Sequence, residues 1–184
     1  MQASLRPRHY HLLSDGELQL LLPVFSVLRD RRASLLDEFF KRYIAHFGSQ
    51  ASLGWRDFSD LYGRDLDAMS KHLSDCDMED FAAEVRALGH VMCERGVPFA
   101  EVISSLHLLE ESLATVLGPA VARGELSSRI FQIFDKLSHC RIIVLASAFL
   151  QKTLTRSPFA IPRRARFPAT ASARRARRWA WVRA

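Results

Sequence analysis

The chain has 184 residues, of which 48% are hydrophobic, and its formal net charge is +6 at neutral pH. A chain of this length buries one core, which argues against two full domains. Its three cysteines are widely separated and show no C-x-x-C spacing. Neither a disulfide framework nor a structural zinc site is therefore predicted.

The positive charge is concentrated at the C-terminal end of the chain. From Arg156 onward there are nine arginines and no lysine, aspartate or glutamate, which leaves 17 basic and 20 acidic residues before it. We therefore divide the chain into a helical domain, residues 1–155, and an Arg/Ala/Pro-rich tail, residues 156–184. The composition of the tail predicts disorder, with binding to nucleic acid or an anionic membrane as an alternative. GC-rich DNA read in a wrong frame gives a similar composition, so a truncated or frameshifted gene is a further hypothesis.

The length of the apolar segments bears on where the protein is located in the cell. The N-terminus has no continuous apolar segment of the kind found in signal peptides, and the most apolar run, residues 142–150, is too short to span a bilayer. We predict a cytoplasmic protein.

Apolar residues recur at helical spacing up to the tail, and no stretch alternates as a strand does. The sequence predicts an all-α bundle of five to seven helices. The first begins at Ser14, where S-x-x-E has the spacing of a capping box, and Pro23 is expected to interrupt it or to begin the next helix. Residues 35–47 predict a helix with a broad aromatic face. Residues 55–73 predict another, and Asp77 is placed to cap the helix that follows.

A junction between two helices is predicted around Gly96. Glycine supplies the left-handed backbone that commonly closes a helix, and Pro98 occupies a position where a proline costs no hydrogen bond. The helix that begins there is expected to stop at Gly118 and Pro119. The last helix is predicted from about Ser127 to Thr153.

Histidines are the natural candidates for ligands in such a bundle. Helical spacing places His90 on the solvent side of its helix, opposite Phe81. It places His139 opposite Ile130 and His107 at the edge of its apolar stripe, so neither is expected to be a buried ligand. His46 lies within an aromatic face and is expected to be half-buried, which makes it the one histidine placed to bind a ligand. A structural histidine is the favoured interpretation even there. No H-E-x-x-H, G-x-G-x-x-G, P-loop or G-x-S-x-G motif is present, so no enzyme, cofactor or metal site is predicted.

The segment ALGHVMCERGVPFAEVI, residues 87–103, resembles the N-terminal domain of the RsbT co-antagonist proteins. These are RsbR-type stressosome sensors and related modules fused to bacterial histidine kinases and transcription regulators. The resemblance rests on Gly89, Gly96 and Pro98 in order and spacing, with Trp55 upstream, and it extends over residues 18–154. It implies a globin-like bundle that is generally non-haem. In haem-bearing globin sensors the proximal histidine lies four residues before the closing glycine, and here that position is Met92.

The resemblance also implies a function and partners. Such domains are sensory or regulatory input modules, commonly dimeric, that work through protein contacts and helix shifts with a kinase or a stress-response regulator. The last helix is apolar nearly all round near Ile142, and Ile142, Ile143, Leu145 and Phe149 form the candidate dimer or partner face. Complete burial of these residues within one subunit is an equal alternative. A globin-like sensor that binds haem or a small ligand is the second functional hypothesis.

Overall fold

The structure is a computed structural model that describes residues 13–75 and 77–156, with side chains up to residue 151. Within these ranges the fold is all-α, with six α-helices, one short 3-10 helix and no strand, which confirms the predicted fold class. The elements are α1 (Asp15–Asp30), α2 (Arg32–Phe47), η1 (Gly48–Gln50), α3 (Trp55–Ser74), α4 (Met78–Glu94), α5 (Phe99–Ala122) and α6 (Ile130–Arg156). None of these described helices is long and apolar enough to cross a membrane. Residues 157–184 lie outside the described part, so the disorder predicted for the tail stays a prediction.

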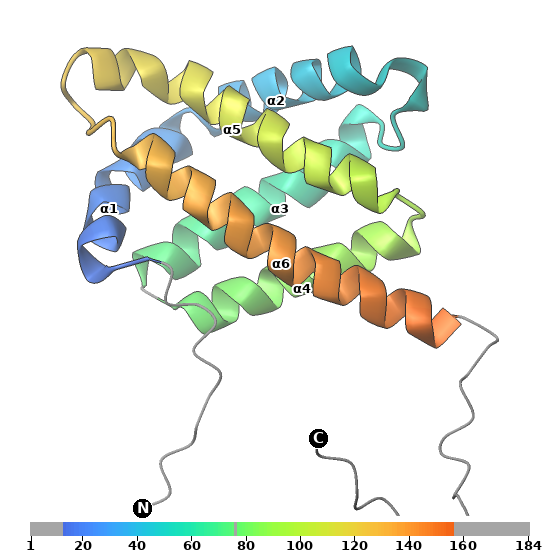
Figure 1. The fold of residues 1–184 in the computed structure, drawn as a ribbon. Coiled ribbons are helices and arrows are strands. Elements are labelled where there is room, and N and C mark those ends of the chain that lie inside the picture. Colours follow the sequence, from blue (N-terminus) through green and yellow to red (C-terminus); the bar gives the residue numbers. More distant parts are fainter. Residues whose placement is uncertain (1–12, 76, 157–184) are drawn as a thin grey trace, which may run out of the picture.

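The helices form a bundle in which α6 crosses the front diagonally (Figure 1). It packs against α4 and α5, while α3 lies behind it and contacts α1, α2 and α4. The core is aromatic where α2 meets α3, because Phe39 lies 4.7 Å from both Phe58 and Tyr62 between ring centroids in edge-to-face geometry. Such aromatic pairs add about 0.5–1.5 kcal/mol each beyond the burial of their area.

The start of α1 confirms the predicted capping box. The Ser14 amide donates to Glu17 Oε2 at 2.8 Å, and the Glu17 amide donates to Ser14 Oγ at 3.3 Å.

The prediction for Pro23 was wrong, because Pro23 lies inside one continuous helix. It sits on the exposed side of α1, where water can solvate the carbonyl that a proline leaves without a donor.

The predicted end of α5 was also wrong. The helix runs through Gly118 and Pro119 to Ala122, and it ends where Gly124 has a φ of 76°. Thr115, four residues before Pro119, is exposed, so its carbonyl can be solvated, while the burial of Leu117 keeps the last turn on the core.

The junction between α4 and α5 follows the sequence prediction. Gly96 has a φ of 76°, its amide donates to the Cys93 carbonyl at 3.2 Å, and the Val97 amide donates to the Met92 carbonyl at 3.0 Å. These two bonds form a Schellman motif, and Met92 and Val97 at its two ends are both buried in the core. Pro98 is the N-cap of α5.

Candidate interaction site on the last helix

The outer face of α6 carries large apolar side chains in contact with solvent. Ile143 and Leu150 are 63% and 64% exposed, the highest values among the large hydrophobic residues of the described chain. They are seven positions apart, so they lie on the same side of the helix, with the exposed Ser147 between them. We call Ile143, Ser147 and Leu150 the α6 outer face.

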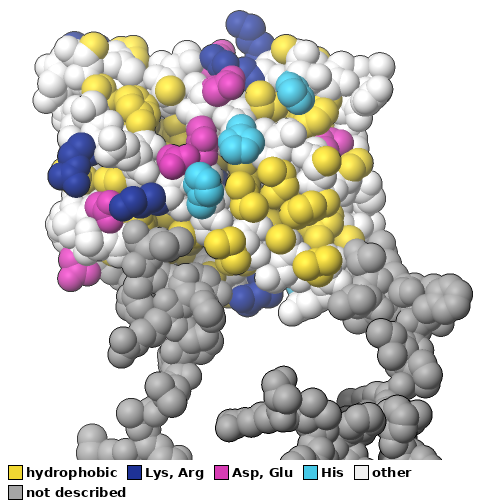
Figure 2. Space-filling model, in the orientation of Figure 1, with side chains coloured by type: hydrophobic (Ala, Val, Ile, Leu, Met, Phe, Trp, Pro, Cys, Tyr) yellow, Lys and Arg dark blue, Asp and Glu magenta, His cyan; other side chains and the backbone are white. Residues whose placement is uncertain are grey.

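A wider apolar surface continues from the α6 outer face. Figure 2 shows hydrophobic side chains gathered on the side of the molecule that α6 crosses. Phe99, at the start of α5, is 38% exposed, and its ring centroid lies 5.1 Å from that of Phe149 on α6. Scattered exposed hydrophobic residues are normal on a protein surface, but a contiguous group is typical of an interaction site.

The four residues predicted as a dimer or partner face are not all exposed in the structure. Of the four, Ile143 is exposed and Ile142 is half-buried, whereas Leu145 is 0% exposed and Phe149 only 9%. The reason is that α4 and α5 both cover α6, so its buried sector is wide. Leu145 and Phe149 thus belong to the core of the subunit, and Leu150 takes their place on the candidate surface.

Gly89 of α4 provides the close contact with α6. A Cβ atom at position 89 would lie 3.0 Å from the Ala148 Cβ and 3.0 Å from Leu145 Cδ2. Both neighbours are 0% exposed, so they have no free space into which to move. The glycine of the motif is therefore a point of helix packing, since its missing side chain lets α4 and α6 approach.

A buried ion pair anchors the inner side of α6 to α3. Arg141 donates from Nη2 to Asp65 Oδ2, and the two side chains are 3% and 4% exposed. Burial raises the pKa of Asp65, and the positive charge of Arg141 opposes this shift. Arg141 Nε has no hydrogen-bond partner within the part of the chain that the structure describes. Sequence reasoning missed this pair, although Arg141 stands four residues after Leu137 and four before Leu145, at the spacing of the apolar stripe.

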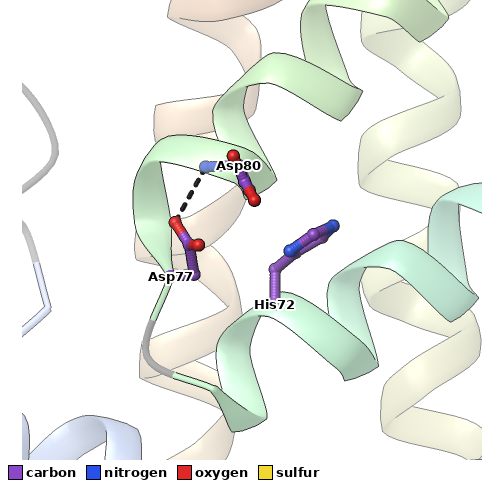
Figure 3. Close-up of side chains that lie close together, drawn as sticks. All are labelled: His72, Asp77 and Asp80. Carbon is purple, nitrogen blue, oxygen red and sulfur yellow. Dashed lines mark hydrogen bonds between the residues drawn. The ribbon is translucent and has the colours of Figure 1, made fainter.

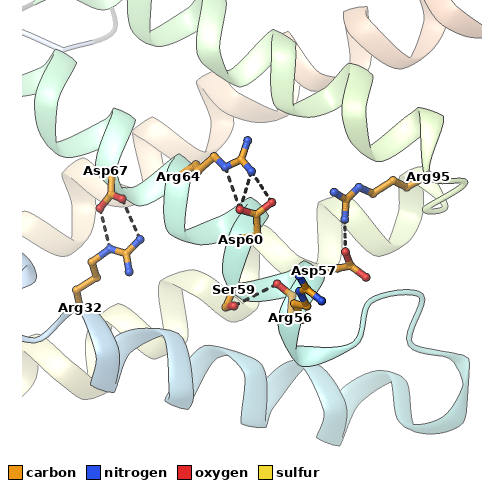
Figure 4. Close-up of polar contacts among 8 residues, drawn as sticks. All are labelled: Arg32, Arg56, Asp57, Ser59, Asp60, Arg64, Asp67 and Arg95. Atoms are coloured by element: carbon orange, nitrogen blue, oxygen red, sulfur yellow. Dashed lines mark hydrogen bonds and ion pairs between the residues drawn. The ribbon is translucent and has the colours of Figure 1, made fainter.

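A row of ion pairs covers the exposed side of α3 (Figure 4). Arg32 donates to both oxygens of Asp67 at 2.7 and 2.9 Å, and Arg64 pairs with Asp60. Arg32 crosses α3 where Gly63 has no side chain, since a Cβ there would lie 2.6 Å from Arg32 Nη2. Arginines paired in this way do not form a free basic surface of the kind that binds nucleic acid.

The same row also holds the junction between α4 and α5. Arg95, the C-cap of α4, donates from Nη1 to Asp57 Oδ1 at 2.6 Å in the first turn of α3. The α4–α5 junction at Gly96 is therefore fixed to α3 by the ion pair between Arg95 and the Asp57 carboxylate.

The histidines lie partly where the sequence placed them. His107 and His139 are exposed, as predicted, and His139 Nδ1 lies 2.7 Å from the Asp135 carbonyl oxygen. His46 is exposed rather than half-buried, and its ring packs edge-on against Phe47 at 4.6 Å. His90 is half-buried rather than exposed. The reason is that α4 packs against both α3 and α6, so its buried side is wider than one stripe.

The structure buries the position that a proximal histidine would occupy. Met92 stands there, is 0% exposed and is packed in the core. The groove between α3 and α4 beside Asp65 has a volume of about 150 Å³, whereas a groove lined by Leu28, Leu35 and Leu66 has about 490 Å³. Ligand sites usually occupy about 300–1,000 Å³.

Comparison with protein-family models, with curated proteins and with solved structures finds no match for this chain. The resemblance of residues 87–103 to the RsbT co-antagonist domains therefore stays a prediction from the sequence.

Proposed function

We propose that this chain is a sensory or regulatory input domain that acts through protein contacts made by α6. The observation that carries the proposal is the pair Ile143 and Leu150 on one face of a helix whose other sides are buried. Exposed apolar groups on one helix face are suited to pairing with the same face of a second copy around a two-fold axis. The bacterial signalling role follows the resemblance to RsbT co-antagonist domains.

The proposal also includes a mechanism, in which a signal passes through the domain as small shifts of its helices. The inner contacts of α6 support this mechanism. Arg141 ties α6 to α3 at Asp65, and Gly89 of α4 touches α6 at Leu145 and Ala148. A partner that binds the α6 outer face therefore acts on a helix that contacts most of the bundle. Packed helices respond by moving in small discrete steps, because a dense interior does not deform continuously.

The competing haem hypothesis has less support from the fold, because Met92, and not a histidine, is buried at the position of a proximal ligand. Absorbance spectra of the purified chain, before and after addition of haem, distinguish the two. A Soret band that follows one equivalent of haem would favour the competing hypothesis.

The test of the proposal is the oligomeric state of two matched double variants. Ile143→Glu with Leu150→Glu places two carboxylates on the α6 outer face. Leu22→Glu with Ile44→Glu is the control, because these side chains are 38% exposed on α1 and α2. Sedimentation velocity should show a dimer for the wild type and the control, and a monomer for the first variant. A wild-type chain that stays monomeric at high concentration, or equal dimerisation of all three proteins, would contradict the proposal.

A further inference from the structure

Three potential metal ligands meet where α3 passes into α4. His72 is in the last turn of α3, Asp77 is the N-cap of α4, and Asp80 is in the first turn of α4. One ligand atom from each lies within 4.8 Å of the other two. Figure 3 shows His72 rising from the end of α3 beside the turn that carries Asp77 and Asp80, with one ring nitrogen on the side nearer to them. The loop thus brings together residues that lie on two different helices.

The His72 side chain is buried without a hydrogen bond that holds its ring in the described ranges. The residue is 8% exposed, and its ring acts on the nearby Asp77 through charge, since the Asp80 amide first and the His72 ring to a smaller extent lower the pKa of Asp77. Buried polar side chains nearly always have a hydrogen-bond partner. The ring nitrogen faces carboxylates that stand too far away for a hydrogen bond and near enough to share a bound cation.

The separation of the ligand atoms is close to that of the ligands of one divalent cation. Zinc binds imidazole nitrogen and carboxylate oxygen at about 2.0–2.2 Å in a tetrahedral arrangement, so two of its ligands stand about 3.3–3.6 Å apart. The three ligand atoms here lie within 4.8 Å of one another, so the side chains would draw together when the ion binds. We propose that His72, Asp77 and Asp80 form a site for one divalent cation of the zinc class, with water completing its coordination. Asp80 is exposed, so the ion can enter from solvent.

The hydrogen bonds of the turn are compatible with this site. Asp77 Oδ1 accepts the Asp80 amide at 3.0 Å as the helix cap, and a carboxylate oxygen can accept a hydrogen bond and bind a cation at the same time. The C-terminal end of α3 carries partial negative charge, which favours a cation. The positive N-terminal end of α4 disfavours one, and the carboxylates of Asp77, Glu79 and Asp80 offset it.

The bound ion would add a second polar link between two helices that already share the Arg95–Asp57 pair at their other ends. It would bridge the end of α3 to the start of α4, and α4 contacts α6 through Gly89. The site lies apart from the α6 outer face, so metal binding and dimerisation can be measured independently. Because the ion binds the folded arrangement, it raises the thermal stability of the chain.

The experiment titrates Zn²⁺ into the full metal-free chain in competition with a chromophoric chelator. His72→Gln, Asp80→Asn and Asp77→Ser each remove one ligand, and serine at position 77 keeps the helix cap. Each variant should weaken binding roughly tenfold or more, since even outer-shell changes cost 10–100-fold. Each should also lose most of the rise in melting temperature that Zn²⁺ gives the wild type.

Two controls separate this site from other zinc-binding groups. Asp75→Asn alters a neighbouring exposed carboxylate, and His107→Gln alters an exposed histidine on α5. Both should bind Zn²⁺ as the wild type does. Circular dichroism without metal checks that the variants fold, and Asp80→Asn changes an exposed side chain in any case. Unchanged affinity in Asp80→Asn and His72→Gln, or an equal loss in the controls, would overturn the assignment.

Discussion

Gly89→Ala tests the contact by which α4 holds α6. The added methyl group would meet the Ala148 Cβ and Leu145 Cδ2, each at 3.0 Å, which is well inside ordinary van der Waals contact. The Leu145 side chain can rotate only into a filled core, and the Ala148 Cβ moves only with the α6 backbone. The substitution therefore forces the two helices apart by a few tenths of an ångström.

Two opposing free energies decide the outcome. Overpacking a dense core typically costs about 1–3 kcal/mol. Replacing glycine by alanine inside a helix returns about 0.5–1 kcal/mol. We expect Gly89→Ala to lower the free energy of unfolding by about 1–2 kcal/mol. Gly16→Ala is the matched control, because nothing lies within 4 Å of a Cβ there, and its effect should be neutral or stabilising.

Urea unfolding followed by circular dichroism measures both effects. A second substitution sharpens the test, since Ala148→Gly removes one of the two atoms that the new methyl group meets. The double variant should be more stable than the sum of the single effects predicts, as expected for residues in contact. Gly89→Ala as stable as Gly16→Ala, with no coupling to position 148, would refute the claim that this glycine is required for packing.

Two further predictions concern charged pairs. Asp65→Ala should lower the free energy of unfolding by about 3–5 kcal/mol, because Arg141 stays buried without its partner, whereas Asp65→Leu combined with Arg141→Met should recover most of the loss. Urea unfolding of the wild type and of these two variants checks this, and a small effect of Asp65→Ala alone would contradict it. Lys136 and the Ser14 backbone lower the pKa of Glu17 from 4.5 to about 2. The stabilisation from this lowered pKa is complete above pH 4.5 and is lost as the pH falls toward 2, so Lys136→Met should show a shallower loss of stability over that interval, measured as melting temperature against pH.

The sequence alone predicted the helices well and their interruptions badly. Capping signals at Ser14 and Asp77 and the left-handed glycine at position 96 are local, so they can be read without the fold. The effects of Pro23 and Pro119 depend on whether the carbonyl that each leaves free faces water. That depends on the tertiary arrangement, which helical spacing does not specify.

The candidate site was predicted only in part for a similar reason. Helical spacing identified α6 as apolar all round, but which of its residues stay exposed depends on how many helices cover it. Leu145 and Phe149 were named for the candidate face, with burial as an equal alternative, because the sequence does not show that both α4 and α5 pack there. Gly89 is a similar case. A glycine in a helical pattern indicates that another element packs closely against the helix, but the sequence does not show which element this is.

The buried pair restricts the motions that α6 can make. If α6 slid by one turn along the bundle, Arg141 would leave Asp65, and an unpaired buried charge costs about 3–5 kcal/mol. A helix held only by leucines would have no such penalty for sliding. A signal that enters at Ile143 and Leu150 should therefore move α6 together with α3, and the most extensive contact of α6 that is then left to change is the one with α4 at Gly89. This makes the packing between α4 and α6 the part of the bundle where the proposed signalling motion should be measured, by hydrogen exchange in α4 with and without the two glutamates on the α6 outer face.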